Sequence, residues 1–328
     1  MTPFTYTRAE SVDAAIEAYE QAPDVRFIGG GTNLLDLMKM GVERPTHLID
    51  INRLPLADIA EHDGGVRIGA LVRNTDAANH PLIRSRYPVL SEALLAGASQ
   101  QLRNMATMGG NLMQRTRCYY FYDPSYGECN KRVPGSGCAA KQGYNRIHAI
   151  LGASERCIAT NPSDMSVALA ILNAVIQVKG PRGERSIPIA QFHRLPGDTP
   201  QVDTNLHPGE LITAIDLPPV PFAQRSRYLK VRDRNSYAFA LVSVAAALDV
   251  DNGTVRQVRI ALGGVAHKPW RAENAERSLI DKKADETNFR AAAEAELRDA
   301  RPLRHNAFKV ELAKRSMVRA LAMTANMA

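Results

Sequence analysis

All four cysteines of this 328-residue chain fall within one window of 40 residues, from Cys118 to Cys157. They are spaced C-x10-C-x8-C-x18-C, and the same window holds five of the ten tyrosines. Glycines and prolines recur between the cysteines, and such a composition interrupts both helices and strands. We therefore expect residues 115–158 to form an ordered loop with little apolar periodicity of its own.

The residues alone leave three interpretations of these cysteines open. Disulfides are typical of small secreted domains, whereas a chain of this length can bury a sizeable core without them, so disulfides or merely buried cysteines are the first alternative. Structural zinc usually takes cysteines in pairs about two to four residues apart, and the spacing contains no such pair. A 4Fe–4S cluster is held by four thiolates that can be dispersed along a loop.

The charge of this window bears on the choice. Between residues 115 and 146 the chain carries six basic and two acidic side chains. We expect this positive excess to offset the negative charge of four thiolates.

The composition of the whole chain excludes several classes of protein. The net charge is +7 and the pI is near 9.3, but the basic residues are dispersed and form no nucleic-acid-binding motif. No run of about 20 apolar residues is present, so we expect no membrane span. The N-terminal residues MTPFTYTRAE lack a basic stretch and an apolar stretch, so we also expect no signal peptide on this chain.

Two glycine-rich segments are candidate ligand-binding turns. Residues 25–28 form a short predicted strand, residues 29–33 read GGGTN, and residues 34–40 form an apolar helical piece. This arrangement lets backbone N–H groups surround a phosphate, although it matches neither the P-loop nor the dinucleotide fingerprint. The second segment, residues 107–112 (TMGGNL), offers the side chains of Thr107 and Asn111. For both segments a plain turn is the alternative interpretation.

Hydrophobic periodicity and turn residues predict most of the remaining elements. In the first part we expect helices at 11–21, 88–96 and 165–174, strands at 47–51, 66–72 and 211–217, and a hairpin of 175–178 with 185–189. Residues 218–221 are the candidate boundary. Beyond them we expect strands at 228–232, 239–250 and 254–262, then helices at 271–279, 287–297 and 307–323. The predicted class is α+β, with a small α+β domain at 222–328.

The two glycine segments, residues 27–34 and 107–112, resemble the two FAD loops in the flavin subunit of the xanthine dehydrogenase family of molybdenum hydroxylases. The resemblance continues through residues 162–165 (PSDM), 211–212, 230–232 (KVR), 263–266 (GGVA) and Arg271, and so covers essentially the whole chain. It implies a two-part FAD-binding domain of the vanillyl-alcohol-oxidase type at residues 1–218, followed by the small domain at 222–328.

The cysteine window resembles an insertion found in two groups of this family. One is the FAD subunit of bacterial periplasmic aldehyde oxidoreductase, and the other is the β subunit of 4-hydroxybenzoyl-CoA reductase. The sequence of this insertion is closer to the first group at residues 115–118 (RTRC), 129–132 (CNKR) and 134–138 (PGSGC). The resemblance implies that a 4Fe–4S cluster is held by Cys118, Cys129, Cys138 and Cys157, within an insertion at 115–158.

The resemblance also implies the residues that hold FAD. The backbone of the first loop would bind the pyrophosphate, the second loop would contact the cofactor, and Asp164 would bind its ribitol or ribose side. Ile212 would pack on the ring system and Lys230 would lie near the flavin. The implied cofactor-binding set is Phe27, Ile28, Gly29, Gly30, Gly31, Thr32, Asn33, Leu34, Thr107, Gly109, Gly110, Asn111, Asp164, Ile212 and Lys230.

The function implied is electron transfer with no bond chemistry on the substrate. The chain would carry FAD and the 4Fe–4S cluster in a heterotrimeric aldehyde oxidoreductase, with a molybdenum-cofactor large subunit and a 2Fe–2S small subunit. It would pass electrons to an external acceptor. The complex would reach the periplasm folded, through a partner's twin-arginine signal, with a cytoplasmic location as the alternative. The alternative functions are a hydroxybenzoyl-CoA-reductase-like β subunit and a free-standing flavin oxidoreductase.

Overall fold

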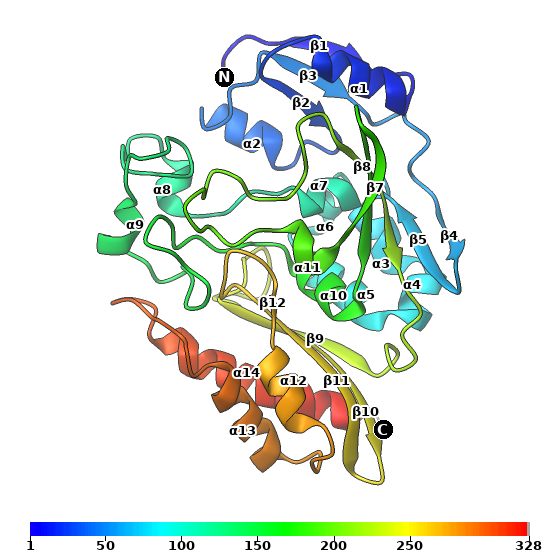
Figure 1. Ribbon diagram of the computed structural model, residues 1–328, viewed down its shortest axis with the longest axis vertical. Coiled ribbons are helices and arrows are strands. Elements are labelled where there is room, and N and C mark those ends of the chain that lie inside the picture. Colours follow the sequence, from blue (N-terminus) through cyan, green and yellow to red (C-terminus); the bar gives the residue numbers. More distant parts are fainter. Residues whose placement is uncertain (327–328) are drawn as a thin grey trace.

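The computed structural model describes residues 1–326, and within them the chain forms three sheets with helices packed between and around them (Figure 1). The first sheet is parallel, with strand order β1-β3-β2, and is built from β1 (Thr5–Arg8), β2 (Val25–Ile28) and β3 (His47–Asp50). Helix α1 (Val12–Glu20) crosses from β1 to β2. It begins where the Ser11 hydroxyl accepts a hydrogen bond from the Ala14 N–H at 3.0 Å, which satisfies a free helix donor as predicted.

The second sheet is antiparallel, with strand order β4-β5-β8-β6-β7. Its strands are β4 (Ile59–His62), β5 (Gly65–Gly69), β6 (Val175–Gly180), β7 (Gly183–Pro188) and β8 (Leu211–Leu217). The helices of this part are α2 (Leu34–Lys39), α3 (Asn74–Asn79), α4 (Pro81–Arg86), α5 (Pro88–Ala96), α6 (Gln100–Arg103), α7 (Met108–Leu112), α10 (Asp164–Leu172) and α11 (Ile189–Phe192). The β6–β7 hairpin is the one predicted from the sequence.

The third sheet, β12-β11-β10-β9, is also antiparallel and belongs to the C-terminal part. It consists of β9 (Ser226–Val231), β10 (Val242–Asp251), β11 (Thr254–Gly263) and β12 (Trp270–Arg271). Helices α12 (Glu273–Leu279), α13 (Glu286–Glu296) and α14 (Phe308–Ala325) cover one face, seen in orange and red in Figure 1. Asn252 and Gly253, with φ of 48° and 73°, make the predicted turn between β10 and β11.

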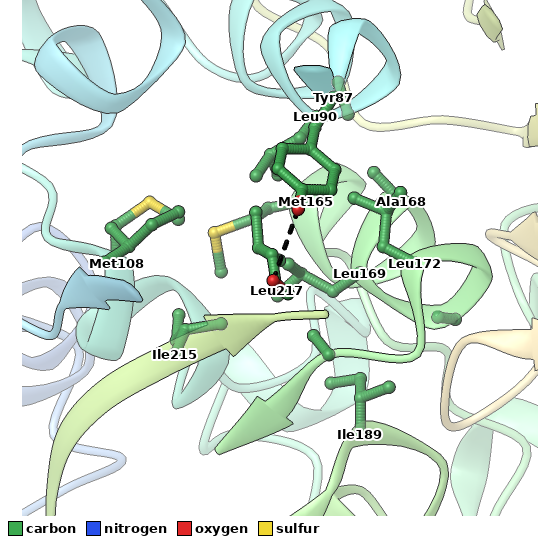
Figure 2. Close-up of a cluster of buried hydrophobic side chains, with 14 of the residues drawn as sticks. Tyr87, Leu90, Met108, Met165, Ala168, Leu169, Leu172, Ile189, Ile215 and Leu217 are labelled. Carbon is green, nitrogen blue, oxygen red and sulfur yellow. Dashed lines mark hydrogen bonds between the residues drawn. The ribbon is translucent and has the colours of Figure 1, made fainter. Parts of the chain in front are cut away.

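Helices α5 and α10 lie between the second and third sheets and give the two parts of the chain a common core. That core includes Ile215 of β8, Leu169 of α10 and Ala245 of β10, all buried. Figure 2 shows Met165, Leu169 and Leu172 of α10 among side chains from β8 and α5. Because α10 is buried almost all round, both sheets are held at fixed positions against it.

The predicted α+β class with a composite first part and a smaller second part is confirmed. The predicted domain limits remain predictions, and the last two residues of 222–328 lie outside the described residues. Within residues 1–326, no helix combines the length and apolar character that crossing a membrane requires. Two segments are more helical than predicted: residues 108–112 form the short helix α7, and the cysteine loop contains α8 (Tyr119–Tyr122) and α9 (Ala139–Gln142).

Tyr87 provides a test of the shared core. Its ring is 1% exposed, and its hydroxyl donates to the carbonyls of Leu217 and Pro218 at 3.3 and 3.1 Å, where β8 ends (Figure 2). Tyr87→Phe leaves these buried carbonyls without that donor, so we expect the free energy of unfolding to fall by about 1 kcal/mol. Denaturant midpoints measure the change. Tyr144→Phe, on a ring that is 52% exposed, is the matched control and should shift the midpoint little. Equal midpoints for Tyr87→Phe and the parent would contradict this account.

Candidate functional site

The first glycine segment presents a row of free backbone donors. The N–H groups of residues 29 to 34 donate to no other protein group within the described part of the chain. Gly31 has a φ of +72°, and its carbonyl accepts from Leu35 as α2 begins. Consecutive N–H groups in a turn between a strand and a helix form a concave site for an anion. These residues therefore fit the pyrophosphate-binding role implied by the resemblance.

The second glycine segment packs directly against the first. A Cβ added to Gly30 would lie 1.9 Å from the carbonyl oxygen of Met105, and one added to Gly29 would lie 3.2 Å from the Thr107 hydroxyl. Thr107 accepts a hydrogen bond from the Gly110 N–H at 3.1 Å and so caps α7. The N–H of Gly109 donates to Ala70 at 2.8 Å. These N–H groups of the second segment are thus already hydrogen-bonded within the segment and to Ala70, unlike those of residues 29 to 34.

Two residues that the sequence interpretation missed hold this arrangement. The side-chain amide of Asn52 donates to the carbonyl of Gly29 at 2.9 Å. Arg73 donates to the carbonyl of Met105 at 2.6 Å and to the side chain of Asn52 at 3.1 Å. Asn52 follows β3 in the chain and could have been noticed as a polar residue at a strand end, but nothing in the sequence connects it to Arg73.

Asp164 and Lys230, both predicted to contact the cofactor, contact each other. Lys230 Nζ lies 2.7 Å from one carboxylate oxygen of Asp164, and the Tyr228 hydroxyl donates to the other at 2.6 Å. The two charged side chains are 8% and 4% exposed. Burial, and next the charge of Asp164, raise the pKa of Tyr228 well above its ordinary value. This contact ties α10 to β9, so Asp164 serves to join the two parts of the chain, and its cofactor contact remains a prediction.

Ile212 lies inside the core shared by the two parts. Its side chain is 5% exposed, in β8. Its predicted contact with the flavin ring system also stays a prediction.

The four cysteines converge on one small cavity. Cys118, Cys129, Cys138 and Cys157 all line it, together with apolar side chains such as Phe121. Cys129 and Cys138 also pair through a β-bridge. Burial raises the pKa of Cys118 to about 12 and that of Cys157 to about 11, so the thiolate forms need a compensating cation. Residues that are 39 positions apart in the chain are thus brought to one place.

The state of these thiols bears on the three interpretations. Within residues 1–326 the four cysteines are all free, so no disulfide joins them. Among the same residues, no three His, Cys, Asp or Glu side chains are placed to bind a single metal ion. Among the described residues the structure therefore contains neither a disulfide nor a preformed metal site.

The basic residues of the cysteine loop were expected to offset the charge of four thiolates, and for most of them this expectation is wrong. Five of the six basic residues are ion-paired, Arg115 with Glu43 and Asp203, Arg117 with Asp36, Lys131 with Asp203, Lys141 with Glu155, and Arg146 with Asp233. The sixth, Arg132, donates to main-chain carbonyls. Of the six, Lys131 lines the cavity. Burial alone would raise the pKa of Asp203, but the charges of Lys131 and Arg115 outweigh it and lower the pKa to about 2.

One side chain connects the glycine loop with the cysteine loop. The side-chain oxygen Oδ1 of Asn33 accepts from the backbone N–H of Arg115 at 2.9 Å, and the side-chain Nδ2 donates to the Tyr122 hydroxyl at 3.0 Å. Figure 1 accordingly shows α8 beside α2. The sequence interpretation assigned Asn33 to the cofactor loop alone, and its link across 82 and 89 positions carries no local signal.

Comparison with known families adds independent information. Residues 2–220 match the model of the FAD-binding domain in molybdopterin dehydrogenase. Residues 227–324 match the C-terminal domain of the CO dehydrogenase flavoprotein. The two matches together span nearly the whole chain.

Individual relatives agree with these matches. The chain is 54% identical to the FAD-binding subunit of aldehyde oxidoreductase from Escherichia coli, over 98% of each chain. It is 31% identical to the medium chain of glyceraldehyde dehydrogenase from Sulfolobus acidocaldarius, over 86% of this chain and 83% of that one. Among solved structures, carbon monoxide dehydrogenase from Hydrogenophaga pseudoflava superposes with a TM-score of 0.77 at 27% identity, covering 99% of this chain and 98% of that chain.

Gly30→Ala tests the contact between the two glycine segments. The added methyl group would collide with the Met105 carbonyl, so the segments must separate and the row of donors must move. We expect the purified protein to lose most of its flavin, measured as FAD released per chain on denaturation. Gly127→Ala is the control, because a Cβ there meets nothing within 4 Å. Full FAD retention in Gly30→Ala would show that the contact does not position the site.

Lys230→Met tests the buried tie between the two parts. The substitution leaves the Asp164 carboxylate buried without its cation, and we expect the free energy of unfolding to fall by about 3–5 kcal/mol. The double variant with Asp164→Asn should be destabilised by less than the sum of the single variants. Arg277→Met breaks an exposed pair with Glu273, whose side chains are 67% and 69% exposed, and should change the denaturation midpoint little. Additive effects of Asp164→Asn and Lys230→Met would contradict the tie.

Proposed function

The chain belongs to the family of FAD-binding subunits of molybdopterin dehydrogenases, and on that premise we propose that it is the electron-transfer subunit of a molybdenum-dependent aldehyde oxidoreductase. The observation that carries the proposal is the 54% identity over 98% of both chains with a subunit of that activity. In this role the aldehyde is oxidised on a partner subunit, and this chain receives the electrons and releases them.

The residues of this chain would hold FAD as follows. The free N–H groups of residues 29 to 34 would bind the pyrophosphate, and the segment from Met105 to Asn111 would keep them in place. Bound FAD supplies the exchange between two-electron and one-electron steps, while the protein supplies position and electrostatics. Neither glycine segment contains a His or Cys for a covalent bond, so the cofactor would be held non-covalently.

We propose further that the four cysteines hold a 4Fe–4S cluster. The proposal is supported by four free thiols that line one cavity. Because burial raises the pKa of Cys118 and Cys157, iron would have to provide the charge that stabilises both thiolates.

The proposed partners are a molybdenum-cofactor large subunit and a 2Fe–2S small subunit, with an external electron acceptor. The name medium chain, given to relatives from Sulfolobus acidocaldarius and Hydrogenophaga pseudoflava, agrees with a middle-sized subunit of such an assembly. The proposed location is the periplasm, reached by the folded complex through a partner's twin-arginine signal. Recovery of the complex wholly from the cytoplasm, when all partners are expressed, would overturn this location.

Co-purification distinguishes the proposal from a free-standing flavin oxidoreductase. A tagged chain expressed with its neighbouring subunits should bring down molybdenum and 2Fe–2S polypeptides in equal amounts, and only that complex should oxidise aldehydes. Aldehyde or other substrate oxidation by the single chain would favour the free-standing enzyme. Activity of the complex on hydroxybenzoyl-CoA with no aldehyde oxidation would favour the reductase-like alternative.

Cys129→Ser tests the four-cysteine assignment. Loss of one thiolate should cost the cluster, so we expect iron from this site to disappear while FAD is largely retained, because the free donors of residues 29 to 34 lie outside the cysteine loop. Iron, zinc and FAD per chain, with low-temperature EPR after reduction, measure the outcome. Gly127→Ala in the same loop is the control and should keep its iron. About four irons per chain in Cys129→Ser would refute the assignment, and zinc in the parent would replace the cluster with a structural metal.

A further inference from the structure

His148 is buried beside one of the four cysteines and has a single hydrogen-bond partner on its ring. The residue is 1% exposed, and its Nε2 lies 3.1 Å from the sulfur of Cys118. Its other ring nitrogen, Nδ1, has no partner within the described part of the chain. Burying a polar ring is unfavourable unless it is hydrogen-bonded, so the contact with Cys118 is what stabilises an imidazole here.

The main chain at His148 is fixed from the C-terminal part of the protein. Lys309, at the start of α14, donates from Nζ to the carbonyl of His148 at 2.8 Å and to that of Gly264 at 2.5 Å. Asn306 donates from its side chain to the same His148 carbonyl at 3.2 Å. Buried hydrogen bonds from the C-terminal part of the chain therefore fix the backbone from which the ring extends toward Cys118.

The imidazole of His148 can carry a proton on Nε2 in either protonation state. The neutral ring has one N–H, which can be on either nitrogen, and the protonated ring has two. A thiolate sulfur bound to iron can only accept a hydrogen bond, so the proton must be on Nε2 when Cys118 is a ligand.

We propose that His148 donates a hydrogen bond from Nε2 to the sulfur of Cys118 and thereby raises the reduction potential of the cluster. The inference rests on the proposed 4Fe–4S site. Reduction adds negative charge to the cluster and its sulfur ligands, so a donor at 3.1 Å favours the reduced state over the oxidised one. His148 would act as a positioning residue through its contact with Cys118.

The competing account is that His148 only fills space next to Tyr120, whose ring centroid lies 6.2 Å away. His148→Phe keeps a flat ring and removes the donor, whereas His148→Gln keeps an N–H donor on a flexible side chain. His305→Phe is the matched control, because His305 stacks on Tyr144 at 5.3 Å and is not part of the cysteine cavity.

The first measurement is an EPR-monitored redox titration of the intact complex for each variant, with iron counted per chain. We expect His148→Phe to keep its iron and to have a more negative midpoint potential, with His148→Gln between it and the parent and His305→Phe unchanged. An unchanged midpoint in iron-replete His148→Phe would overturn the proposal.

The second measurement needs no variant to hold the cluster. The parent complex is labelled with ¹⁵N-histidine, reduced and examined by pulsed EPR. We expect a ¹⁵N coupling transmitted through the hydrogen bond. This coupling should be absent from labelled His148→Gln or His148→Phe that retains iron. If both variants lose iron, the parent spectrum decides, and a cluster signal without any ¹⁵N coupling overturns the role of His148. A parent without iron overturns the cluster itself and this inference with it, which is a distinguishable result.

Discussion

The close approach of two backbone segments, Gly30 and Met105, is the contact on which the candidate flavin site depends. Because only a hydrogen atom fits between them, the segment before α7 packs directly against the turn that follows β2. The N–H groups of Gly109 and Gly110, in the second glycine segment, already donate hydrogen bonds within the protein. Those of residues 29 to 34 stay free. The two glycine-rich segments thus have different roles. The second segment holds the first in position, and the first provides the N–H groups for binding.

A second constraint is the burial of α10 between two sheets. Because this helix has no exposed face, residues at its N-terminus are held close to both parts of the chain. Asp164 stands at that N-terminus and receives Lys230 and Tyr228 from β9. The orientation of the C-terminal part relative to the glycine segments is therefore set by packing along α10 and by one buried ion pair at its end.

Local chemistry allowed much of this to be predicted, and distance in the sequence limited the rest. The cap at Ser11, the β10–β11 turn and the strand before Gly29 are decided within a few residues, so patterns reveal them. Asp164 and Lys230 were both predicted near a cofactor, but a pattern cannot show that one neutralises the other. Segment 108–112 was expected to be a turn, and it becomes a helix because Thr107 caps it.

The cysteine loop shows the same limit in its electrostatics. Counting charges predicted a basic loop around four thiolates, but most of those cations are matched by carboxylates from elsewhere in the chain. What the fold leaves near the cysteines is a smaller set of buried positive groups. Lys131 lines the cavity and shares Asp203 with Arg115.

Lys309, at the start of α14, reaches the cysteine loop through the carbonyl of His148. It is fully buried and has only carbonyl partners among residues 1–326, so burial, and next the charge of Arg146, lower its pKa to about 7. A buried cation without a carboxylate partner and thiols that resist ionisation are each unfavourable alone. The proposed cluster on the four sulfurs would relieve both, because its negative charge would offset that of Lys309 and its iron would stabilise the thiolates. Under that proposal, loading of the metal would stabilise the folded loop.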